Sequence, residues 1–600
     1  MSTVTTLTPA HGRTSTLLWL ALLLAAVLTY VLGLDGQYVP TNGDELVYSH
    51  IARLTAASGQ WLPLVSELDH MRNTKPPLLI WQAMLAGDWG QHWTMAALRT
   101  PSVIYTLLLT GAIGFTVQRI SRDVSRGLLA ACLYLAFFST FRFGRTYLTS
   151  APETFWLSLP MFVLLWWPLH RPNAEHRVSL GWWVHALFGL AMGLGLAYKS
   201  FALIAPAAAT LWSAQLLTQS PLNGQKIFQT TLKVSLSALI ALGIFGLWFV
   251  LDPDPAAVWQ EFVVGENAGK LNNSAGYWHT ALFGGGFSIW SQLLGYAQNA
   301  GLLVLVIIGL MLMGARHLWC HRWQALTSQS VSFLVLLVWL GIWLAVFTVP
   351  SQRSMRYLIP AMPALAMVLA LCWQGIGRLW FVPTLLLCGV FMGYLGRIAW
   401  AEQVFGLGNA ADVAWTLIAV AMGLGLVLAG LFRPAWTRAC TLAASLAVFA
   451  VFGLATVPLN GPSGHYSTQV LQQLQGQQVA VPSSFNGQFE RFEFTLPGNH
   501  FVPYDGDGRA AFSSADNAAF LSALLEKHQA VVWLQTHEEN TEPLCAPHCT
   551  VLGQRWEVKG RHQSGEITLA NIWYPEQWLF RREWLLTNAA PWAATATSKP

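Results

Sequence analysis

Long apolar runs constrain this chain more than any other feature of its sequence. An α-helix needs about 20 apolar residues to cross the hydrocarbon core of a bilayer, and we count roughly thirteen such runs. The third is short and the fifth and sixth are close together, so one or two more or fewer spans are allowed. The runs lie near residues 17–34, 97–118, 127–141, 151–169, 181–197, 201–218, 232–251, 292–314, 329–349, 357–373, 379–396, 411–431 and 439–457. We therefore expect a polytopic α-helical membrane protein.

Charge is scarce in this chain. Only 10% of its 600 residues are charged and 54% are hydrophobic, whereas about 25% of the residues of a soluble protein are charged. The net charge of +5 is small, and the basic residues form short clusters between apolar runs. Such clusters are typical of topology determinants and not of a nucleic-acid surface, so nucleic acid is not an expected partner.

The basic clusters occupy alternate loops, which the positive-inside rule assigns to the cytoplasm together with the N-terminus. They comprise Arg119, Arg122, Arg126, Arg171, Arg177, Lys226, Lys233, Arg316, Arg322, Arg378, Arg433 and Arg438. The first run follows Arg13 but lacks a clear small-x-small cleavage site, so we expect a retained span and not a signal peptide. An odd number of spans then puts the C-terminal segment outside.

The other loops carry charges of both signs, which an outward loop with no further role would tend to lack. They comprise residues 41–77, 141–150, the neighbourhood of Lys199, 252–288 and 351–357. We expect these distant segments to assemble an ionic active site at the water-facing ends of the helices. A transporter would more often have an ionisable group near mid-membrane, on a broken helix or in a repeat, and we detect no repeat.

Residues 41–77 contain a predicted short amphipathic helix that lies along the membrane surface. Asn42 is a good N-cap with Glu45 at N3, and apolar residues recur at helical spacing before Gly59 offers a stop. Asp44 and Glu45 therefore have a structural alternative, because carboxylates in a first turn are favoured by the N-terminal partial charge.

Beyond residue 460 the composition changes to that of a soluble domain. We divide the chain into a membrane domain, residues 1–460, and an outward α/β domain, residues 461–600, which is large enough for its own core. Strand-length apolar runs lie at 478–482 and 530–534, and an amphipathic helix is expected at 518–528.

Two of the seven cysteines, Cys545 and Cys549, lie in this outward domain, four residues apart, whereas the others lie in or beside spans. A disulfide between them is plausible in an oxidising compartment. Zinc is less so, because neither His537 nor His548 has convincing ligand spacing.

Five sequence segments carry a resemblance to a known family. They read G-D-E-L-V-Y-S-H-I-A-R-L-T-A-A-S-G-Q-W-L followed by K-P-P-L-L-I-W, F-G-R-T-Y-L-T-S-A-P-E-T from Phe143, G-L-A-Y-K-S-F-A-L from Gly195, G-E-N-A-G-K from Gly265, and S-Q-R-S-M-R-Y-L-I-P-A-M-P from Ser351. In this order they resemble the GT-C membrane glycosyltransferases that use polyprenyl-phosphate sugars, related to protein O-mannosyltransferases and to bacterial aminoarabinose transferases of lipid A. The span layout with an outward C-terminal domain is similar to the aminoarabinose branch.

The resemblance implies three catalytic candidates, Asp44, Glu45 and Glu153. Asp44 occupies the position of the acid that acts near the acceptor, as a general base or by orienting it in an inverting transfer. Glu45 is its neighbour and a weaker candidate. Glu153 stands where the family commonly has an aspartate, and its structural alternative is a helix-start acid.

The leaving lipid phosphate must be met by fixed cations near the headgroup plane. The donor-phosphate candidates are Lys75, Arg353 and Arg356, with Tyr357 as a hydrogen-bond donor; the alternative for the three cations is snorkelling to the headgroups. Supporting candidates are Tyr48, Arg53, Arg145, Lys199, Glu266 and Lys270. For Arg145 and Lys199 a structural ion pair is the alternative.

The chain also departs from the family pattern. Relatives often have an acid before the Lys-Pro-Pro element, where this chain has Thr74, and a histidine in the second large loop, where it has Asn267. We therefore expect no catalytic metal and no cofactor.

The leading interpretation is a hexosyl- or pentosyltransferase of the bacterial inner membrane, with its C-terminal domain in the periplasm. It would take a sugar from an undecaprenyl-phosphate donor and pass it to lipid A or lipopolysaccharide, another envelope glycan or a protein. One alternative is a lipid or glycan transporter or flippase without transferase activity. Another is a catalytically silent relative whose outward domain binds a partner.

Overall fold

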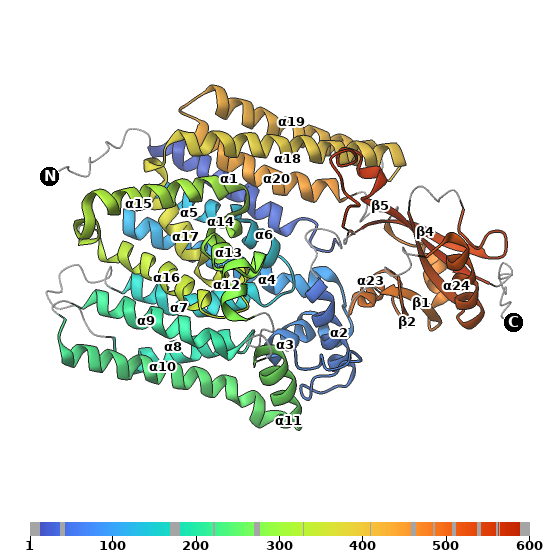
Figure 1. Cartoon of the computed structure of the whole chain (residues 1–600), viewed down its shortest axis with the longest axis horizontal. Coiled ribbons are helices and arrows are strands. Elements are labelled where there is room, and N and C mark those ends of the chain that lie inside the picture. Colours follow the sequence, from blue (N-terminus) through green and yellow to red (C-terminus); the bar gives the residue numbers. More distant parts are fainter. Residues whose placement is uncertain are drawn as a thin grey trace.

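A bundle of long helices forms most of the molecule, and a small sheet lies beyond one end of it (Figure 1). The computed structural model describes residues 12–36, 43–167, 180–219, 222–268, 276–327, 329–407, 410–457, 464–483, 487–506, 512–536, 542–559, 562 and 564–588. Within them, nine helices are long and apolar enough to cross a membrane, or ten if one bent pair is a single span. The expected polytopic membrane fold is confirmed, whereas the count of thirteen spans stays a prediction.

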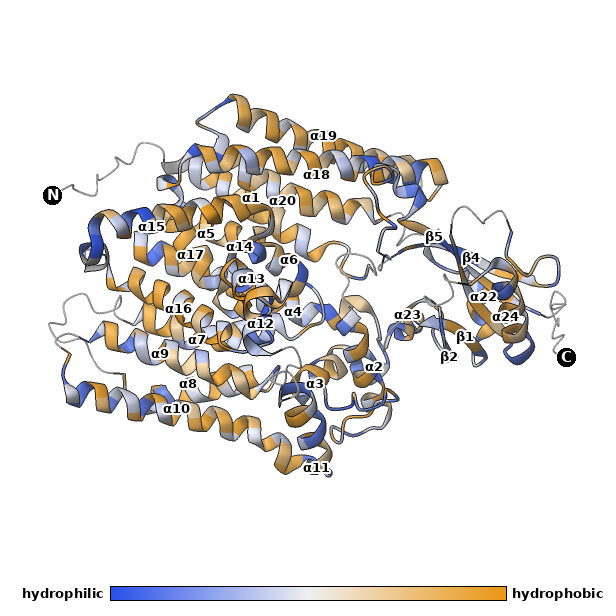
Figure 2. Ribbon diagram, viewed as in Figure 1, coloured by the Kyte–Doolittle hydropathy of each residue, from blue (hydrophilic) through white to orange (hydrophobic). Residues whose placement is uncertain are grey.

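The helices of the bundle follow the expected apolar runs. They are α1 (Gly12–Val31), α4 (Met95–Ser121), α5 (Val124–Ala136), α6 (Phe138–Gly144), α7 (Ser150–Trp166), α8 (Trp182–Leu196), α9 (Ile204–Thr218), α10 (Gly224–Leu251), α14 (Gly295–Ala300), α15 (Val304–Thr327), α16 (Val331–Thr348), α17 (Met362–Cys372), α18 (Arg378–Phe405), α19 (Ala410–Phe432) and α20 (Thr437–Ala455). Apolar residues dominate these helices, and hydrophilic ones gather towards their ends (Figure 2). α4, α10 and α16 begin after Thr94, Asn223 and Ser330, whose side chains accept backbone N–H groups of the first turn.

Short helices connect the long ones. They are α2 (Gly43–Ala57), α3 (Pro77–Ala86), α11 (Pro255–Val258), α12 (Tyr277–Phe283), α13 (Ile289–Leu293), the π-helical η4 (Trp259–Ala268) and the 3₁₀ turns η1 (Asp88–Gly90), η3 (Phe201–Leu203), η6 (Gly285–Phe287), η7 (Gly301–Leu303), η8 (Met355–Ala361) and η9 (Trp373–Gly375). α2, α3 and α11 lie at the end of the bundle nearest the sheet (Figure 1). The predicted helix in residues 41–77 is thus confirmed as α2, although its expected cap, Asn42, is outside the described residues.

The sheet has five strands in the order β2-β1-β3-β5-β4. The strands are β1 (Gln478–Ser483), β2 (His500–Asp505), β3 (Ala530–Thr536), β4 (Thr550–Val558) and β5 (Phe580–Thr587), with helices α22 (Thr468–Leu474), α23 (Phe492–Thr495) and α24 (Ser514–Lys527) and 3₁₀ turns η11 (Gln488–Arg491) and η14 (Pro575–Gln577). β1 pairs in parallel with β2 and β3, and β5 pairs antiparallel with β3 and β4. β1, β3 and α24 confirm the two strands and the helix expected from the sequence.

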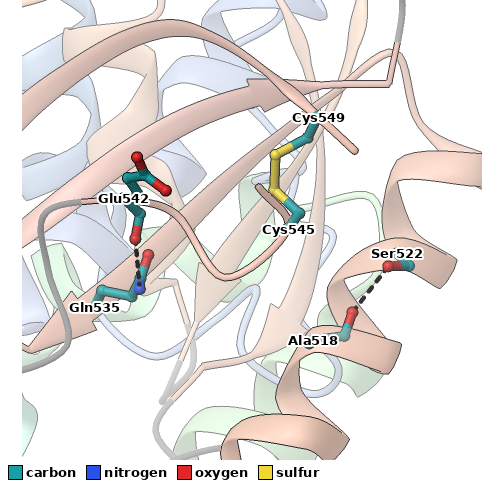
Figure 3. The surroundings of a disulfide bond; sticks show 6 residues. All are labelled: Ala518, Ser522, Gln535, Glu542, Cys545 and Cys549. Carbon is teal, nitrogen blue, oxygen red and sulfur yellow. Dashed lines mark hydrogen bonds between the residues drawn. A yellow bond between two sulfur atoms is a disulfide. The ribbon is translucent and has the colours of Figure 1, made fainter. Parts of the chain in front are cut away.

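Cys545 and Cys549 form a disulfide in the segment between β3 and β4 (Figure 3). The backbone of the same segment is tied to β3, because the Gln535 side chain donates a hydrogen bond to the carbonyl oxygen of Glu542. The pairing that was plausible from the sequence is therefore present. His537, one of the two histidines considered as zinc ligands near these cysteines, lies outside the described residues.

Two joints hold the sheet region against the bundle. At the first, η11 and α23 contact α2, where the backbone of Gly487 lies against Val47. At the second, Phe405 at the end of α18 packs against Trp556 of β4 and Phe580 of β5, with ring centroids 5.1 and 6.0 Å apart. The first joint is followed further below because α2 carries Asp44, a predicted catalytic residue.

Candidate active site

Three ion pairs form between segments that are distant in sequence. Arg356 of η8 donates to Asp44 of α2 at 3.1 Å, and Lys75, just before α3, donates to Glu266 of η4 at 2.7 Å. A third pair, at 2.7 Å, joins Lys199 and Glu153. We call these six residues the ionic cluster.

Tyr48 of α2 lies at the centre of the ionic cluster. Its side chain is buried, and Lys75 Nζ lies 5.8 Å from the ring centroid. Burial raises the pKa of Tyr48 well above its usual value; the charge of Asp44 adds to this rise, and that of Arg356 opposes it. Charges from all three pairs therefore act on one hydroxyl group.

Three cations lie close together in the ionic cluster. Burial lowers the pKa of Lys199, Glu153 opposes this shift, and the positive charges of Arg356 and Lys75 add to it. Lys199 Nζ also lies 6.0 Å from the ring centroid of Tyr357. Mutual repulsion among the three cations favours a site that accepts an anion.

Arg142 adds a fourth cation, which the sequence did not single out. The chain bends by 65° between helices α5 and α6, where the backbone of Phe137 is extended. Arg142 lies in α6, just after that bend. Arg142 and Arg356 both lie over the ring of Phe143, at 5.4 and 4.8 Å from its centroid. The only signal in the sequence was its place between two aromatic residues in an outward loop.

Exposure separates the two carboxylates of the first turn of α2. The Asp44 side chain is 46% exposed and that of Glu45 2%. Glu45 accepts two hydrogen bonds from buried Arg99, at 2.7 and 2.9 Å, and one from the backbone N–H of Tyr147. Asp44 can meet a ligand, whereas Glu45 fixes α2 to α4. Arg99 was missed because nothing near it in the sequence indicates a carboxylate partner.

Arg353 and Arg145 are committed to backbone carbonyl groups. Buried Arg353 donates to Thr348 O at 2.7 Å, to Phe287 O at 3.1 Å and to the Tyr277 hydroxyl at 3.1 Å. Arg145 donates to the carbonyl groups of Tyr30 and Leu32 at the end of α1. The structure does not bring these two arginines into the ionic cluster, although the sequence placed both at the site.

Arg53 belongs to the first joint and not to the ionic cluster. It donates to both oxygens of Glu490, at 2.8 and 2.9 Å, and lies 3.1 Å from Glu493. Burial outweighs Arg53 and raises the pKa of Glu493 to about 7. Burial alone would lower the pKa of Arg53, but the hydrogen bond and the charge of Glu490 raise it. The pKa shifts of Arg53 and Glu493 have one explanation. Glu490 accepts two hydrogen bonds from the Arg53 guanidinium, so Glu493 is the weaker partner of Arg53.

His50 completes the first joint. The His50 Nδ1 atom lies 3.0 Å from Glu490, and its Nε2 atom accepts the backbone N–H of Glu67 at 3.2 Å. A ring nitrogen that accepts carries no proton, so Nδ1–H is the donor to Glu490. The joint therefore holds α2 through a histidine and an arginine that share one buried carboxylate.

The remaining candidates are placed as follows. Tyr357 is half-buried, with its ring 5.1 Å from that of Phe347, beside Lys199. Glu266 is the partner of Lys75. Lys270 lies outside the described residues.

The described residues do not suit a metal ion. No group of three or more histidine, cysteine, aspartate or glutamate side chains comes together in the part of the chain that the structure describes. Asn267 accepts from the Ser200 hydroxyl and donates to Phe262 O, at 2.9 and 2.7 Å. Thr74 offers its carbonyl oxygen to Lys75. The Asn267 side chain is thus used for hydrogen bonds within the protein, whereas Thr74 contributes its backbone carbonyl oxygen and not its side chain.

A cavity of about 800 Å³ lies apart from the ionic cluster, between the bundle and the sheet region. Apolar residues of α1 and α20 line one part of it, including Leu28 and Leu454, and Arg145, Glu493 and Arg555 line the other. The ionic cluster itself lies at the start of α7, just after the end of α8 and beside η8.

The chain is similar in sequence to known proteins. Residues 16–260 match the family model described as dolichyl-phosphate-mannose-protein mannosyltransferase. The undecaprenyl phosphate-alpha-4-amino-4-deoxy-L-arabinose arabinosyl transferase 1 of Sodalis glossinidius is 30% identical over 364 residues, 59% of this chain and 58% of the relative. The transferase of the same description from Pectobacterium carotovorum is 24% identical over 425 residues, 69% of this chain and 66% of the relative.

The fold matches over almost the whole chain. The crystal structure of ArnT from Cupriavidus metallidurans bound to undecaprenyl phosphate aligns with a TM-score of 0.56 at 15% identity, covering 96% of this chain and 98% of that one. In sequence, by contrast, the chain spans 58% and 66% of the length of the two curated relatives.

Proposed function

We infer that the chain is a GT-C membrane glycosyltransferase of the group that uses polyprenyl-phosphate sugars. We propose that it moves a sugar from an undecaprenyl-phosphate carrier to lipid A or another envelope acceptor. One observation carries the proposal: Asp44, Lys75, Lys199 and Arg356 come together from four separate segments. Asp44, Lys75 and Arg356 lie near Tyr48, and Lys199 lies near Lys75 and Arg356. The relatives named above support the donor and the sugar class.

Asp44 is proposed as the catalytic base. It removes the proton of an acceptor hydroxyl while the acceptor oxygen forms a bond to the anomeric carbon of the sugar, with inversion. The bond between that carbon and the phosphate oxygen breaks, and its electron pair stays on the undecaprenyl phosphate. An acceptor that attacks through a phosphate oxygen brings no proton, and Asp44 then orients it. Arg356 holds the carboxylate in place for either task.

Lys75, Lys199 and Arg356 are proposed to bind the leaving phosphate. They lie near one another at the outward helix ends, where a lipid phosphate sits, and charge-assisted bonds from lysine and arginine stabilise the negative charge that develops on it. Glu153 and Glu266 hold two of these cations in position. Arg353 has a different proposed role, which is to fix the loop that contains Tyr277 and Phe287.

The proposed location is the bacterial inner membrane, with the N-terminus in the cytoplasm and the sheet region in the periplasm. The positive-inside rule supports this orientation, because the loops at the end opposite the sheet carry Arg122, Lys226 and Arg433. A flippase is less well supported, since the cations of the site lie at one end of the helices and not along a path through the bundle.

The first prediction tests the base. Replacing Asp44 with Asn, in full-length protein reconstituted with undecaprenyl-phosphate aminoarabinose and lipid A, should lower the transfer rate by about 10²- to 10⁴-fold, because the amide cannot accept a proton. Mass spectrometry of lipid A measures the product.

Asp88→Asn is the matched control. Asp88 is exposed, lies outside the ionic cluster, and has a positive φ that asparagine tolerates. Its transfer rate should stay unchanged. A normal rate in Asp44→Asn, or no sugar added by the unmodified protein to lipid A, other glycans or proteins, would count against the proposal.

A further inference from the structure

The segment between β4 and β5 exposes a group of large apolar side chains. Within residues 566–578, which we call the β4–β5 turn, Leu569 is 94% exposed, Trp573 52% and Tyr574 48%, and Ile567 and Ile572 are also exposed. A soluble surface seldom gathers so many apolar side chains on one short turn, and such patches mark an interaction site.

Several polar groups of this turn form hydrogen bonds within it. Asn571 accepts the backbone N–H of Thr568 at 2.7 Å and donates to Glu566 O at 2.8 Å. The Trp578 indole donates to Asn571 O at 3.1 Å. Backbone N–H groups of Ile572 and Tyr574 find acceptors at 2.9 and 2.8 Å. A turn with internally paired polar groups and outward apolar side chains suits an environment that contains little water.

The charges of the turn are paired as well. Glu576 accepts from Arg397 of α18 at 2.6 and 2.7 Å, and Glu566 accepts from Lys559 at 2.6 Å. A carboxylate that is paired costs much less to bring near a lipid phase than a free one.

The β4–β5 turn lies against a span. Tyr394 of α18 donates from its hydroxyl to Ile572 O at 3.1 Å, and its ring lies 5.7 Å from that of Trp573. Figure 1 shows the turn, in red, beside α18. The sheet region therefore reaches back along the outside of the bundle.

The place where the β4–β5 turn contacts α18 indicates the depth of the turn relative to the bilayer. The helix begins at Arg378, and about 20 residues of helix cross the hydrocarbon core. Tyr394 and Arg397 are then at the far boundary of that core. Side chains of α18 on both sides of this level are exposed, including Val390 and Trp400.

We propose that the β4–β5 turn inserts into the headgroup–hydrocarbon boundary of the outward leaflet. Its occupant is phospholipid, because the exposed apolar surface continues from the lipid-facing side of α18 onto Leu569 and Trp573. Tryptophan and tyrosine are the residues that proteins place at this boundary. The insertion anchors the sheet region to the bilayer, in addition to its two joints with the bundle.

The test uses an environment-sensitive dye. Leu569→Cys is made in a full-length background in which Cys320 and Cys372, the two free cysteines that are not buried, are serine. NBD is attached at position 569, and the protein is placed in phospholipid nanodiscs. Blue-shifted emission is expected, with several-fold stronger quenching by doxyl-labelled phospholipid than at a control site.

Ser522→Cys in the same background is that control. Ser522 is an exposed residue of α24, on the part of the sheet region far from the bundle (Figure 1). The dye there should emit as in water and escape the lipid quencher. Water-like emission at position 569 would overturn the proposal. So would blue-shifted emission without lipid quenching, because the turn would then contact protein, such as a second copy of the chain.

Discussion

Two adjacent carboxylates of α2, Asp44 and Glu45, meet opposite environments. Glu45 neutralises Arg99, which is fully buried, and removing one partner of a buried ion pair costs about 3–5 kcal/mol. Glu45→Gln should therefore lower the thermal unfolding temperature markedly. Asp44→Asn, at the neighbouring half-exposed position, should change stability by about 1 kcal/mol or less. Equal losses in the two variants would contradict the separation of roles.

Lys199 and Glu153 allow structure and catalysis to be separated. Glu153 is fully buried, so Lys199→Met leaves an unpaired carboxylate and should destabilise the protein. Adding Glu153→Gln removes that charge and should restore thermal stability. Transfer activity should stay low in the double variant, because no cation at position 199 meets the phosphate. Recovery of activity together with stability would show that the pair is only structural.

At the level of helices and strands, the first joint depends on pH. Burial raises the pKa of Glu493 from its usual value of 4.5 to about 7, so between these pH values the folded state holds a proton there that the unfolded state releases. This group's stabilising contribution is full below about pH 4.5 and is lost as pH rises to about 7. We expect the unfolding temperature to fall across this window, and Glu493→Gln to flatten the decline. An unchanged pH profile in that variant would rule out Glu493 as the source.

The helices and strands also show what could be predicted from the sequence. β1, β3, α2 and α24 were predicted because apolar periodicity and capping residues are local signals. Local signals also placed Asp44, Lys75 and Arg356 in outward loops, and the resemblance joined them. The partners of Arg53 and Glu45 could not be predicted, since Glu490 and Arg99 lie 437 and 54 residues away. A charge in a loop does not reveal which distant group neutralises it, so Arg53, Arg145 and Arg353 were assigned to a site that they do not join.

For the molecule as a whole, the first joint and the contact of the β4–β5 turn with α18 lead to different predictions. Glu490→Gln weakens the contact to Arg53 and His50, and thereby frees the helix that carries Asp44. We expect faster backbone hydrogen exchange in α2 and a fall of about 10-fold or more in kcat, because small misplacements of catalytic groups are costly. Glu576→Gln, at the α18 contact, should leave both α2 exchange and kcat unchanged. Equal effects of the two variants would mean that the first joint has no special link to the site.

The contact between His50 and Glu490 joins groups separated by 440 positions in the chain. During synthesis the ribosome delivers α2 long before η11 exists, so the early helices enter the bilayer while α2 still lacks this restraint. A product that ends before η11 therefore has α2 without this restraint. For the proposed transferase, the restraint on the helix that carries Asp44 is therefore completed only when synthesis is nearly finished.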